Sequence, residues 1–342
     1  MGKKSVTVGF SGGKDSATSI ILLKKEGYDV SALTMKLGLA GEEEKLVKVK
    51  ELAAILKIPH EIIDLRTEFK ERVISYFVES YKAGLTPNPC VMCNNRIKFE
   101  LLMDHGIKNM GSDYFATGHY ADKVIIDGKY FLKEPAERRK SQIYFLSMIG
   151  EEKLKKVLFP IASISLGNVR KTVSGLPLGN EKESQDVCFL SGFKLIDYLK
   201  EHIPEAFREG DILDTDGNKI GRHKGSVNFT IGQRRGTGFP SDGKLYVVKK
   251  NVRNNTITLG KEKDLYSGGF EVSSPVFWKE IKKGENYKVR IRYMSRFEDA
   301  VIKNVSPDSI KAEFTDPVKS VTSGQAGVFF LNNIVVASGF IV

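Results

Sequence analysis

Val6-Thr7-Val8-Gly9-Phe10-Ser11-Gly12-Gly13-Lys14-Asp15-Ser16 is an apolar, β-branched run that breaks into a small polar turn with adjacent glycines. The residues from Ala17 to Lys25 then predict a helix. A strand, a tight loop and a helix start aim backbone N–H groups outward at the positive end of a helix dipole. Such a loop binds anions, and the anion that we expect here is a phosphate.

The spacing within this loop narrows the kind of phosphate site. Neither the Walker pattern G-x-x-x-x-G-K-[ST] nor the Rossmann pattern G-x-G-x-x-G occurs in it. Ser-Gly-Gly-Lys-Asp-Ser at positions 11–16 resembles the PP-loop of the ATP pyrophosphatases, which split ATP between its α- and β-phosphates. Any strand-to-helix turn favours glycine and serine, so a loop without a ligand is the alternative. Ser11, Asp15 and Ser16 around the glycines favour the phosphate site.

Length and charge bound the number of domains and the class of partner. The chain has 342 residues, of which 41% are hydrophobic, and this is enough for two or three cores. Its net charge of +11 favours a polyanionic partner such as nucleic acid, although lysines on solvated faces would also explain it. Three cysteines, no signal peptide and no apolar run of membrane length predict a cytoplasmic protein with no membrane partner.

Strand and helix patterns alternate in the first part of the chain. Strands are predicted over 30–35, 58–65 and 114–119, and helices over 42–56 and 69–83. This order predicts an α/β fold whose parallel sheet has helices on both faces and binds ligands at the carboxyl ends of its strands. The ATP contacts that we expect are Gly9, Phe10, Ser11, Gly12, Gly13, Asp15, Ser16, Met35, Gly118 and His119.

Two cysteines lie between the strands predicted over 58–65 and 114–119. Because prolines keep the chain extended before them, Cys90 and Cys93 are expected at a helix start rather than inside a core. The helix N-terminus, Arg96 and Lys98 should then lower the pKa of the two thiols. C-x-x-C leaves three alternatives open, namely a packed pair of small side chains, a redox pair and half of a metal site.

The third cysteine lies far downstream, in Gln185-Asp186-Val187-Cys188-Phe189. This motif, the PP-loop, T-P-N-P-C-V-M-C-N-N-R-I-K-F at 86–99, A-T-G-H-Y-A at 116–121 and I-G-Q-R-R-G at 231–236 together resemble the tRNA-specific 2-thiouridylase family. Members of that family thiolate the wobble uridine of tRNA. The resemblance implies adenylation of the uridine 2-carbonyl by ATP, with Mg²⁺ on the phosphates beside Asp15. It also implies a persulfide on Cys188, received from a cysteine desulfurase or sulfur relay protein, and makes Cys93 the second catalytic cysteine.

The chain departs from the family pattern near these cysteines. Cys90 stands where the family usually has aspartate, and Lys140-Ser141-Gln142 lacks an acidic residue that is usual there. Cys90, Cys93 and Cys188 are also the ligand set of thiolases that hold a [4Fe–4S] cluster with one open iron. Such a cluster would deliver sulfide without a persulfide. The sequence leaves the choice between a persulfide and a metal-bound sulfide open.

Beyond Cys188 the pattern changes to short strands and turns. Residues 209–214 and 216–220 predict a hairpin with an Asp-Gly turn, and a glycine-rich basic patch follows it. Alternation over 287–293 and 326–330 predicts a small antiparallel β-barrel with a basic strand face. Solvated charges are the alternative to a nucleic-acid surface. The tRNA contacts that we expect are Lys98, Arg222, His223, Lys224, Gln233, Arg234, Arg235, Arg290 and Arg292.

These patterns predict a PP-loop catalytic domain over 1–200, a central β-rich domain that contacts tRNA over 201–270, and a C-terminal β-barrel over 271–342. Two other classes of function would also explain part of these patterns. A PP-loop enzyme that adenylates a small metabolite needs neither a basic barrel nor paired cysteines. A non-enzymatic RNA-binding protein would form no AMP from ATP.

Overall fold

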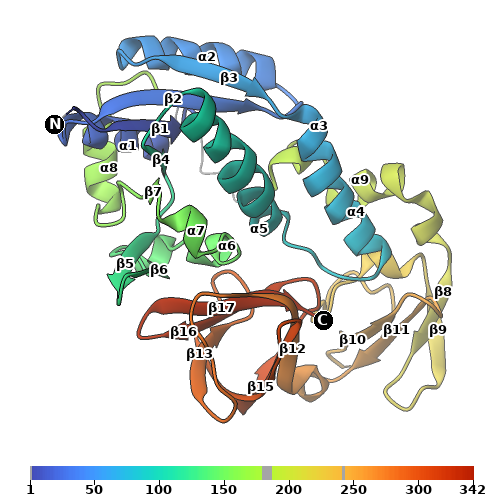
Figure 1. Cartoon of the computed structure of the whole chain (residues 1–342). Helices are drawn as coiled ribbons and strands as arrows, with labels where there is room; N and C mark the ends of the chain where they lie inside the picture. The colour runs from blue at the N-terminus through green and yellow to red at the C-terminus, as the bar shows by residue number, and fades with distance from the viewer. Residues whose placement is uncertain (1, 179–186, 241–242) are drawn as a thin grey trace. The chain divides into compact units, whose positions relative to one another are not determined.

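The computed structural model describes residues 2–178, 187–240 and 243–342. The chain forms two compact units, each described here by itself (Figure 1). Unit 1 comprises Met1–Val73, Cys90–Ser191 and Leu331–Val336, and unit 2 comprises Ile74–Pro89, Gly192–Phe330 and Ala337–Val342. Within the described ranges, no helix is both long and apolar enough to cross a membrane.

Unit 1 contains a five-stranded sheet in the order β3-β2-β1-β4-β7, and every neighbouring pair in it is parallel. Its strands are β1 (Ser5–Gly9), β2 (Asp29–Lys36), β3 (His60–Asp64), β4 (Tyr114–Thr117) and β7 (Val157–Leu158). The predicted parallel α/β fold is confirmed, and β1 lies at the centre of the sheet. The carboxyl end of β1 therefore opens directly into the glycine loop.

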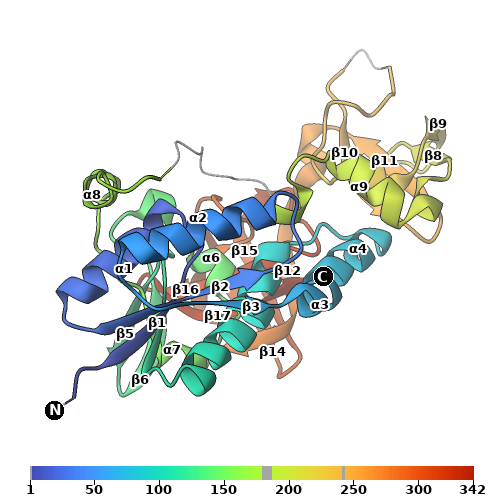
Figure 2. The same ribbon diagram turned by 90° about the horizontal axis from the view of Figure 1, so that it is seen from above.

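Helices cover both faces of this sheet, and successive side chains of β1 point to opposite faces. Val6 and Val8 pack into one core with α1 (Lys14–Lys25) and α2 (Glu42–Ile55), and Figures 1 and 2 show α2 running beside β2 and β3. Thr7 faces the other side, where a Cβ on Gly106 would lie 3.0 Å from the Thr7 Cβ. The remaining helices of this unit are α3 (Arg66–Phe69), η1 (Lys70–Ile74), α5 (Pro89–Cys93), η2 (Asn94–Leu102), η3 (His105–Asn109), η4 (Arg138–Lys140), α6 (Ile143–Leu146), α7 (Glu151–Leu154), α8 (Leu166–Thr172) and η5 (Cys188–Leu190).

An antiparallel hairpin of β5 (Asp122–Ile126) and β6 (Lys129–Lys133) was not among the predicted elements. It follows β4 directly, and its turn contains Asp127 and Gly128, both with positive φ. Ile125 and Ile126 on β5 are exposed, so the alternation of buried and exposed positions that marks a strand is weak here.

Unit 2 contains a small mixed sheet in the order β10-β11-β8-β9, which includes the predicted hairpin. In the turn of that hairpin, Asp214 Oδ1 accepts bonds from the N–H groups of Asp216 and Asn218 at 2.9 and 2.8 Å. The elements are α4 (Ser75–Lys82), α9 (Leu195–His202), η6 (Pro204–Phe207), β8 (Gly210–Leu213), β9 (Lys219–His223), η7 (Ser226–Asn228), β10 (Tyr246–Asn251), β11 (Thr256–Gly260) and η8 (Glu262–Leu265).

The last six strands form the antiparallel barrel that the sequence predicts. Their order is β12-β15-β14-β13-β16-β17, and pairing of β12 with β17 closes it. On β13, Tyr287 and Val289 are buried and Lys288 is exposed, which confirms the alternation. The strands are β12 (Tyr266–Phe277), β13 (Asn286–Arg290), β14 (Glu298–Val305), β15 (Ser309–Lys319), β16 (Ala326–Leu331) and β17 (Ile334–Ile341).

Candidate active site

The loop after β1 forms the N-terminus of α1. Gly12 has a φ of +77°, in the left-handed region that favours glycine, and a Cβ there would lie 2.7 Å from Val49 Cγ2. Gly13 is the N-cap residue, and no side chain caps the helix. Ser11 and Gly13 are exposed. Because the first N–H groups of a helix have no partner within that helix, this end of α1 can donate hydrogen bonds to an anion.

Hydroxyl groups hold the loop in this shape. Ser16 Oγ donates to Gly13 O at 3.0 Å, and Gly13 N donates to Ser11 Oγ at 3.3 Å. The carboxylate of Asp15 accepts a bond from Tyr120 Oη at 3.3 Å. The serines therefore support the loop through internal hydrogen bonds, and Tyr120, which is not among the predicted ATP contacts, orients the one carboxylate of the loop.

Gly118 brings the end of β4 against the start of α1. A Cβ on Gly118 would lie 2.7 Å from both Asp15 C and Ser16 N, so this approach of two backbones requires glycine. Beside it, His119 is buried, and its Nδ1 shares a 2.8 Å hydrogen bond with Thr117 Oγ1. Burial holds the pKa of His119 well below its ordinary value, and the charge of Lys98 lowers it further. The imidazole is therefore neutral near pH 7.

Phe10 and Met35 differ in their surroundings. The Phe10 side chain is buried in the core, its N–H donates to Leu33 O at 2.9 Å, and its carbonyl accepts from Thr34 Oγ1 at 2.7 Å. The backbone of Phe10 therefore ties the start of the loop to β2, and its buried side chain is not available to a ligand. Met35 is half-buried near the carboxyl end of β2 and stays a predicted ATP contact.

The first two cysteines lie on α5, at the predicted helix start. Cys90 is exposed and Cys93 partly exposed, and a spacing of three residues places them on one helix face. Val91 is fully buried, and Asn94 donates from Nδ2 to Phe145 O at 3.2 Å. Buried neighbours thus fix this helix, while Cys90 is exposed and Cys93 is partly exposed as whole residues.

Cys188 begins η5, and its residue is exposed. The next ring, Phe189, packs edge-on against the buried Phe69 with centroids 6.0 Å apart, which anchors the segment within unit 1. The preceding motif residues 184–186 lie outside the described residues. The charge of Cys188 raises the pKa of both Cys90 and Cys93, so the three sulfurs lie within electrostatic range of one another.

Three family models match successive parts of the chain. They are a tRNA methyl transferase HUP domain over residues 4–192, a tRNA methyl transferase PRC-barrel domain over 196–261 and an aminomethyltransferase beta-barrel domain over 267–341. The tRNA-specific 2-thiouridylase MnmA of Treponema denticola is 37% identical, with 98% of this chain and 97% of that protein aligned. The chain belongs to the tRNA-specific 2-thiouridylase family.

Other members of the family match over a similar extent. The tRNA-specific 2-thiouridylase MnmA 1 of Caldanaerobacter subterraneus subsp. tengcongensis is 36% identical, over 98% of this chain and 97% of its own. The MnmA of Acetivibrio thermocellus is 34% identical over the full length of both. The similarity therefore includes both β-rich parts as well as the HUP domain of this thiouridylase-family chain.

The prediction of lowered thiol pKa values in this thiouridylase-family site is wrong. Burial raises the pKa of Cys93 to about 12, and it raises the pKa of Cys90 and Cys188 as well. The charge of Lys98 opposes this effect at all three sulfurs but is the smaller influence. Protein atoms around each sulfur remove water from a thiolate even where part of the residue is exposed. The resting thiols are therefore protonated near pH 7.

Lys98 is the cation shared by these thiols, and its removal has a predictable sign. In Lys98→Met the pKa of Cys93 should rise further, because one cause that lowers it is gone. We expect alkylation of Cys93 by iodoacetamide, followed by peptide mass spectrometry at pH 8, to slow by roughly three- to tenfold. Lys108→Met, on the same stretch of chain, is the control. An unchanged alkylation rate in Lys98→Met would show that the charge of Lys98 does not influence the thiol of Cys93.

The predicted cluster ligands do not form a metal site as they are placed. Within residues 2–178, 187–240 and 243–342, no three His, Cys, Asp or Glu side chains are positioned to hold a metal ion. Cys90, Cys93 and Cys188 nevertheless share one electrostatic environment, because the charge of Cys188 acts on the other two thiols. A cluster held by these three thiols stays a prediction.

The basic patch of the thiouridylase-family chain is divided between exposed and buried residues. Arg222, Lys224, Arg234 and Arg235 are exposed. His223 is buried, its Nε2 lies 3.1 Å from Asn255 O, and its Nδ1 accepts from Gly225 N at 3.1 Å. The prediction that His223 contacts tRNA conflicts with this burial, since both ring nitrogens are used inside the domain.

Gln233 also has an internal role in this part of the chain. Its Oε1 accepts from Thr230 N at 3.1 Å, and its Nε2 donates to Arg235 O at 3.0 Å. Both bonds shape the loop that carries the exposed arginines, so Gln233 positions the loop.

The two barrel arginines differ as well. The guanidinium of Arg290 lies over the Phe297 ring at 4.0 Å from its centroid and 5.8 Å from that of Phe330. Arg292 is exposed. Arg290 is thus packed into the barrel wall, and Arg292 is the better predicted contact for RNA in this member of the family.

Proposed function

We propose that the chain catalyses ATP-dependent 2-thiolation of the wobble uridine in tRNA. The observation that carries this proposal is that the loop at the N-terminus of α1 and all three cysteines belong to one compact unit, in which the charge of Lys98 acts on each thiol. One unit therefore carries a phosphate-binding loop and three thiols in a common electrostatic environment. This combination supports sulfur transfer over the methyl transfer named in the family-model descriptions.

The activation step uses the loop at the N-terminus of α1. Backbone N–H groups from Ser11 to Ser16 bind the phosphates of ATP, and the helix dipole favours their negative charge. The uridine 2-oxygen attacks the α-phosphate, and pyrophosphate leaves. Asp15, oriented by Tyr120, would hold Mg²⁺ together with the phosphates, and one carboxylate suffices for such a site. The metal would neutralise charge on the departing pyrophosphate.

The sulfur step replaces the adenylated oxygen. A persulfide on Cys188, supplied by a cysteine desulfurase or sulfur relay protein, attacks C2 of the uridine through its outer sulfur, and AMP leaves with the bonding electrons. Cys93 then loses its proton and attacks the inner sulfur of Cys188. A Cys93–Cys188 disulfide forms, and the sulfur stays on C2 as the thiocarbonyl. A thiol reductant returns both cysteines to their reduced state for the next cycle.

The test of this function is product analysis with the complete chain. Incubation with ATP, Mg²⁺, tRNA and a persulfide-generating desulfurase with cysteine should yield 2-thiouridine, AMP and pyrophosphate in equal amounts, measured by nucleoside mass spectrometry and phosphate analysis. AMP formation with a small acid and no thionucleoside would instead identify a metabolite-adenylating enzyme. No AMP under any of these conditions would identify an RNA-binding protein without this activity.

The variant Cys90→Ala discriminates between sulfur transfer from a persulfide and sulfur transfer from an iron–sulfur cluster. For the persulfide route we expect Cys90→Ala to keep thiolation within about threefold of the unmodified chain, because only Cys93 and Cys188 change their bonds. Anaerobic incubation with iron and sulfide should then leave no bound iron after desalting. Stoichiometric iron with broad visible absorbance, lost together with activity in Cys90→Ala, would establish the cluster instead.

A further inference from the structure

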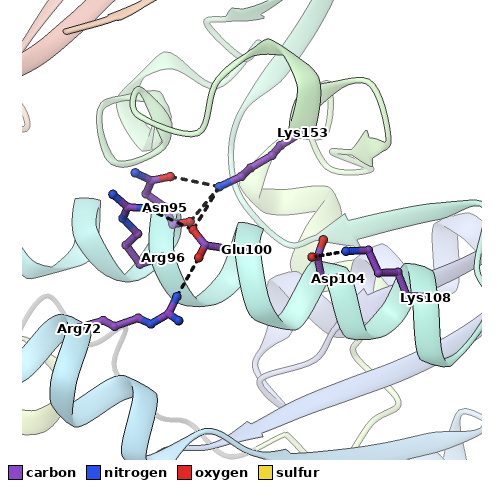
Figure 3. Close-up of polar contacts among 7 residues, drawn as sticks. All are labelled: Arg72, Asn95, Arg96, Glu100, Asp104, Lys108 and Lys153. Carbon is purple, nitrogen blue, oxygen red and sulfur yellow. Dashed lines mark hydrogen bonds and ion pairs between the residues drawn. The ribbon is translucent and has the colours of Figure 1, made fainter. Parts of the chain in front are cut away.

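A cluster of charged side chains lies on the helix that follows Cys93 (Figure 3). Glu100 on η2 accepts from Arg72 Nη1 through Oε1 at 2.7 Å and from Arg96 Nη1 through Oε2 at 3.5 Å. Lys153 Nζ lies 3.8 Å from the same Oε2. Lys153 also donates to Asn95 O and Oδ1 at 3.2 and 3.3 Å. The cluster joins η1, η2 and α7, all within unit 1.

The charges in this cluster do not balance. Three cations surround one carboxylate, so two positive charges remain. Two guanidinium groups that share one carboxylate are held close together despite their mutual repulsion. Glu100 therefore acts as the internal counterion that positions Arg72 and Arg96.

The exposures of the members differ in a way that assigns them roles. The side chains of Arg72 and Arg96 are 39% and 54% exposed, whereas that of Lys153 is 29% exposed. Burial lowers the pKa of Lys153, which is consistent with its inward placement against Asn95. Lys153 thus anchors the cluster, and the two arginines face outward.

The next ion pair along the same stretch of chain is a natural comparison. Lys108 Nζ donates to Asp104 Oδ2 at 2.7 Å, as Figure 3 shows, and this pair has one charge of each sign. A solvated helix face needs only such balanced pairs. Around Glu100, by contrast, three cations share one carboxylate, and the nearby carboxylate of Asp104, whose charge also acts on Lys153, is already paired with Lys108. This excess of positive charge favours an anionic ligand.

We propose that Arg72 and Arg96 form a phosphate-binding site for the RNA backbone, organised by Glu100 and Lys153 beside the cysteine helix. The inference rests on the proposed function and adds to it a contact point in unit 1. Arginine is suited to this role because its planar group donates two parallel hydrogen bonds to phosphate oxygens. Two closely held guanidinium groups can contact one phosphate or two neighbouring ones.

An acidic protein surface, such as that of a sulfur donor, is the other class of partner with this charge. RNA is favoured because the outward-facing cations are both arginines, and a cation excess on three separate elements suits a continuous polyanion. Arg96 lies on η2, which directly follows the helix α5 that carries Cys90 and Cys93, so a backbone bound there would lie beside the cysteine helix.

The test measures tRNA binding against salt concentration. Arg72→Gln with Arg96→Gln should raise the Kd for tRNA about tenfold and reduce the magnitude of the slope of log K against log salt by about one to two. Lys108→Gln is the matched control and should change the Kd less than about twofold. The Kd for ATP and the unfolding midpoint should be unchanged in both variants, because exposed ion pairs contribute little to stability.

Three results would overturn the inference. Wild-type affinity and slope in the double variant would remove the site, as would an equal loss in Lys108→Gln. Normal tRNA binding with slower sulfur transfer from the donor protein would assign the surface to that protein. If the unmodified chain bound no tRNA and formed no 2-thiouridine, the proposed function would fail together with it. If the unmodified chain did both and the double variant kept its tRNA affinity and salt slope, only the phosphate site would be rejected.

Discussion

Cys188→Ser is expected to lower the rate of tRNA thiolation by roughly a thousandfold or more, because it removes the atom that carries the transferred sulfur. A serine hydroxyl cannot form a persulfide and is a poor nucleophile without a base. Binding of ATP and of tRNA should be unchanged, since Cys188 contributes to neither in the proposed mechanism. The measurement is single-turnover formation of 2-thiouridine, with both Kd values determined in parallel.

Cys90→Ser provides the matched control for this experiment. Cys90 is also an exposed thiol in the same environment, and its pKa is likewise raised by burial. A general disturbance of the thiol site would slow both variants alike. Normal thiolation by Cys188→Ser would falsify the assignment of Cys188 as sulfur carrier.

Gly118→Ala is expected to abolish productive ATP binding through backbone crowding alone. The new Cβ would lie 2.7 Å from two backbone atoms of Asp15 and Ser16, which cannot move aside as a flexible side chain would. Either the end of β4 or the start of α1 must shift. We expect a loss of roughly a hundredfold in AMP formation and about 1–3 kcal/mol in the free energy of unfolding.

Gly167→Ala is the control for Gly118→Ala. Nothing lies within 4 Å of a Cβ built on Gly167, which sits in α8 of the same unit. This variant should keep activity and be slightly more stable, since alanine favours the helix. AMP formation at the normal rate in Gly118→Ala would show that the loop tolerates the displacement.

Local patterns in the sequence were enough to predict the parallel sheet, the helix start at Cys90 and the barrel. Hydrophobic periodicity sets which face of a strand or helix is buried, and this acts within a few residues. The loop at 10–16 could be predicted for the same reason, because its glycines and serines serve a turn that those residues build themselves. The hairpin of β5 and β6 was not predicted, because exposed isoleucines obscure the alternation of apolar and polar residues that marks a strand.

Properties that depend on distant contacts could not be predicted from the sequence. The pKa of Cys93 depends on atoms that fold around it, and their desolvation outweighs the neighbouring Lys98. His223 lies in a basic stretch of the sequence, but its Nε2 contacts the backbone oxygen of Asn255, 32 positions later, in the interior of the domain. The role of Lys153 could not be predicted from its local sequence, because its partner Asn95 is 58 positions away along the chain.

The charge of Lys98, which acts on all three thiols, has a consequence for the order of events among them. Cys188 raises the pKa of Cys93, so a negative persulfide on Cys188 would keep Cys93 protonated and unreactive. Once that negative charge has passed to the departing AMP, the influence of Lys98 falls on Cys93 instead, and its deprotonation becomes easier. In the proposed mechanism, this order of charge would delay formation of the Cys93–Cys188 disulfide until the sulfur has reached the uridine, and would so protect the persulfide from early attack by Cys93.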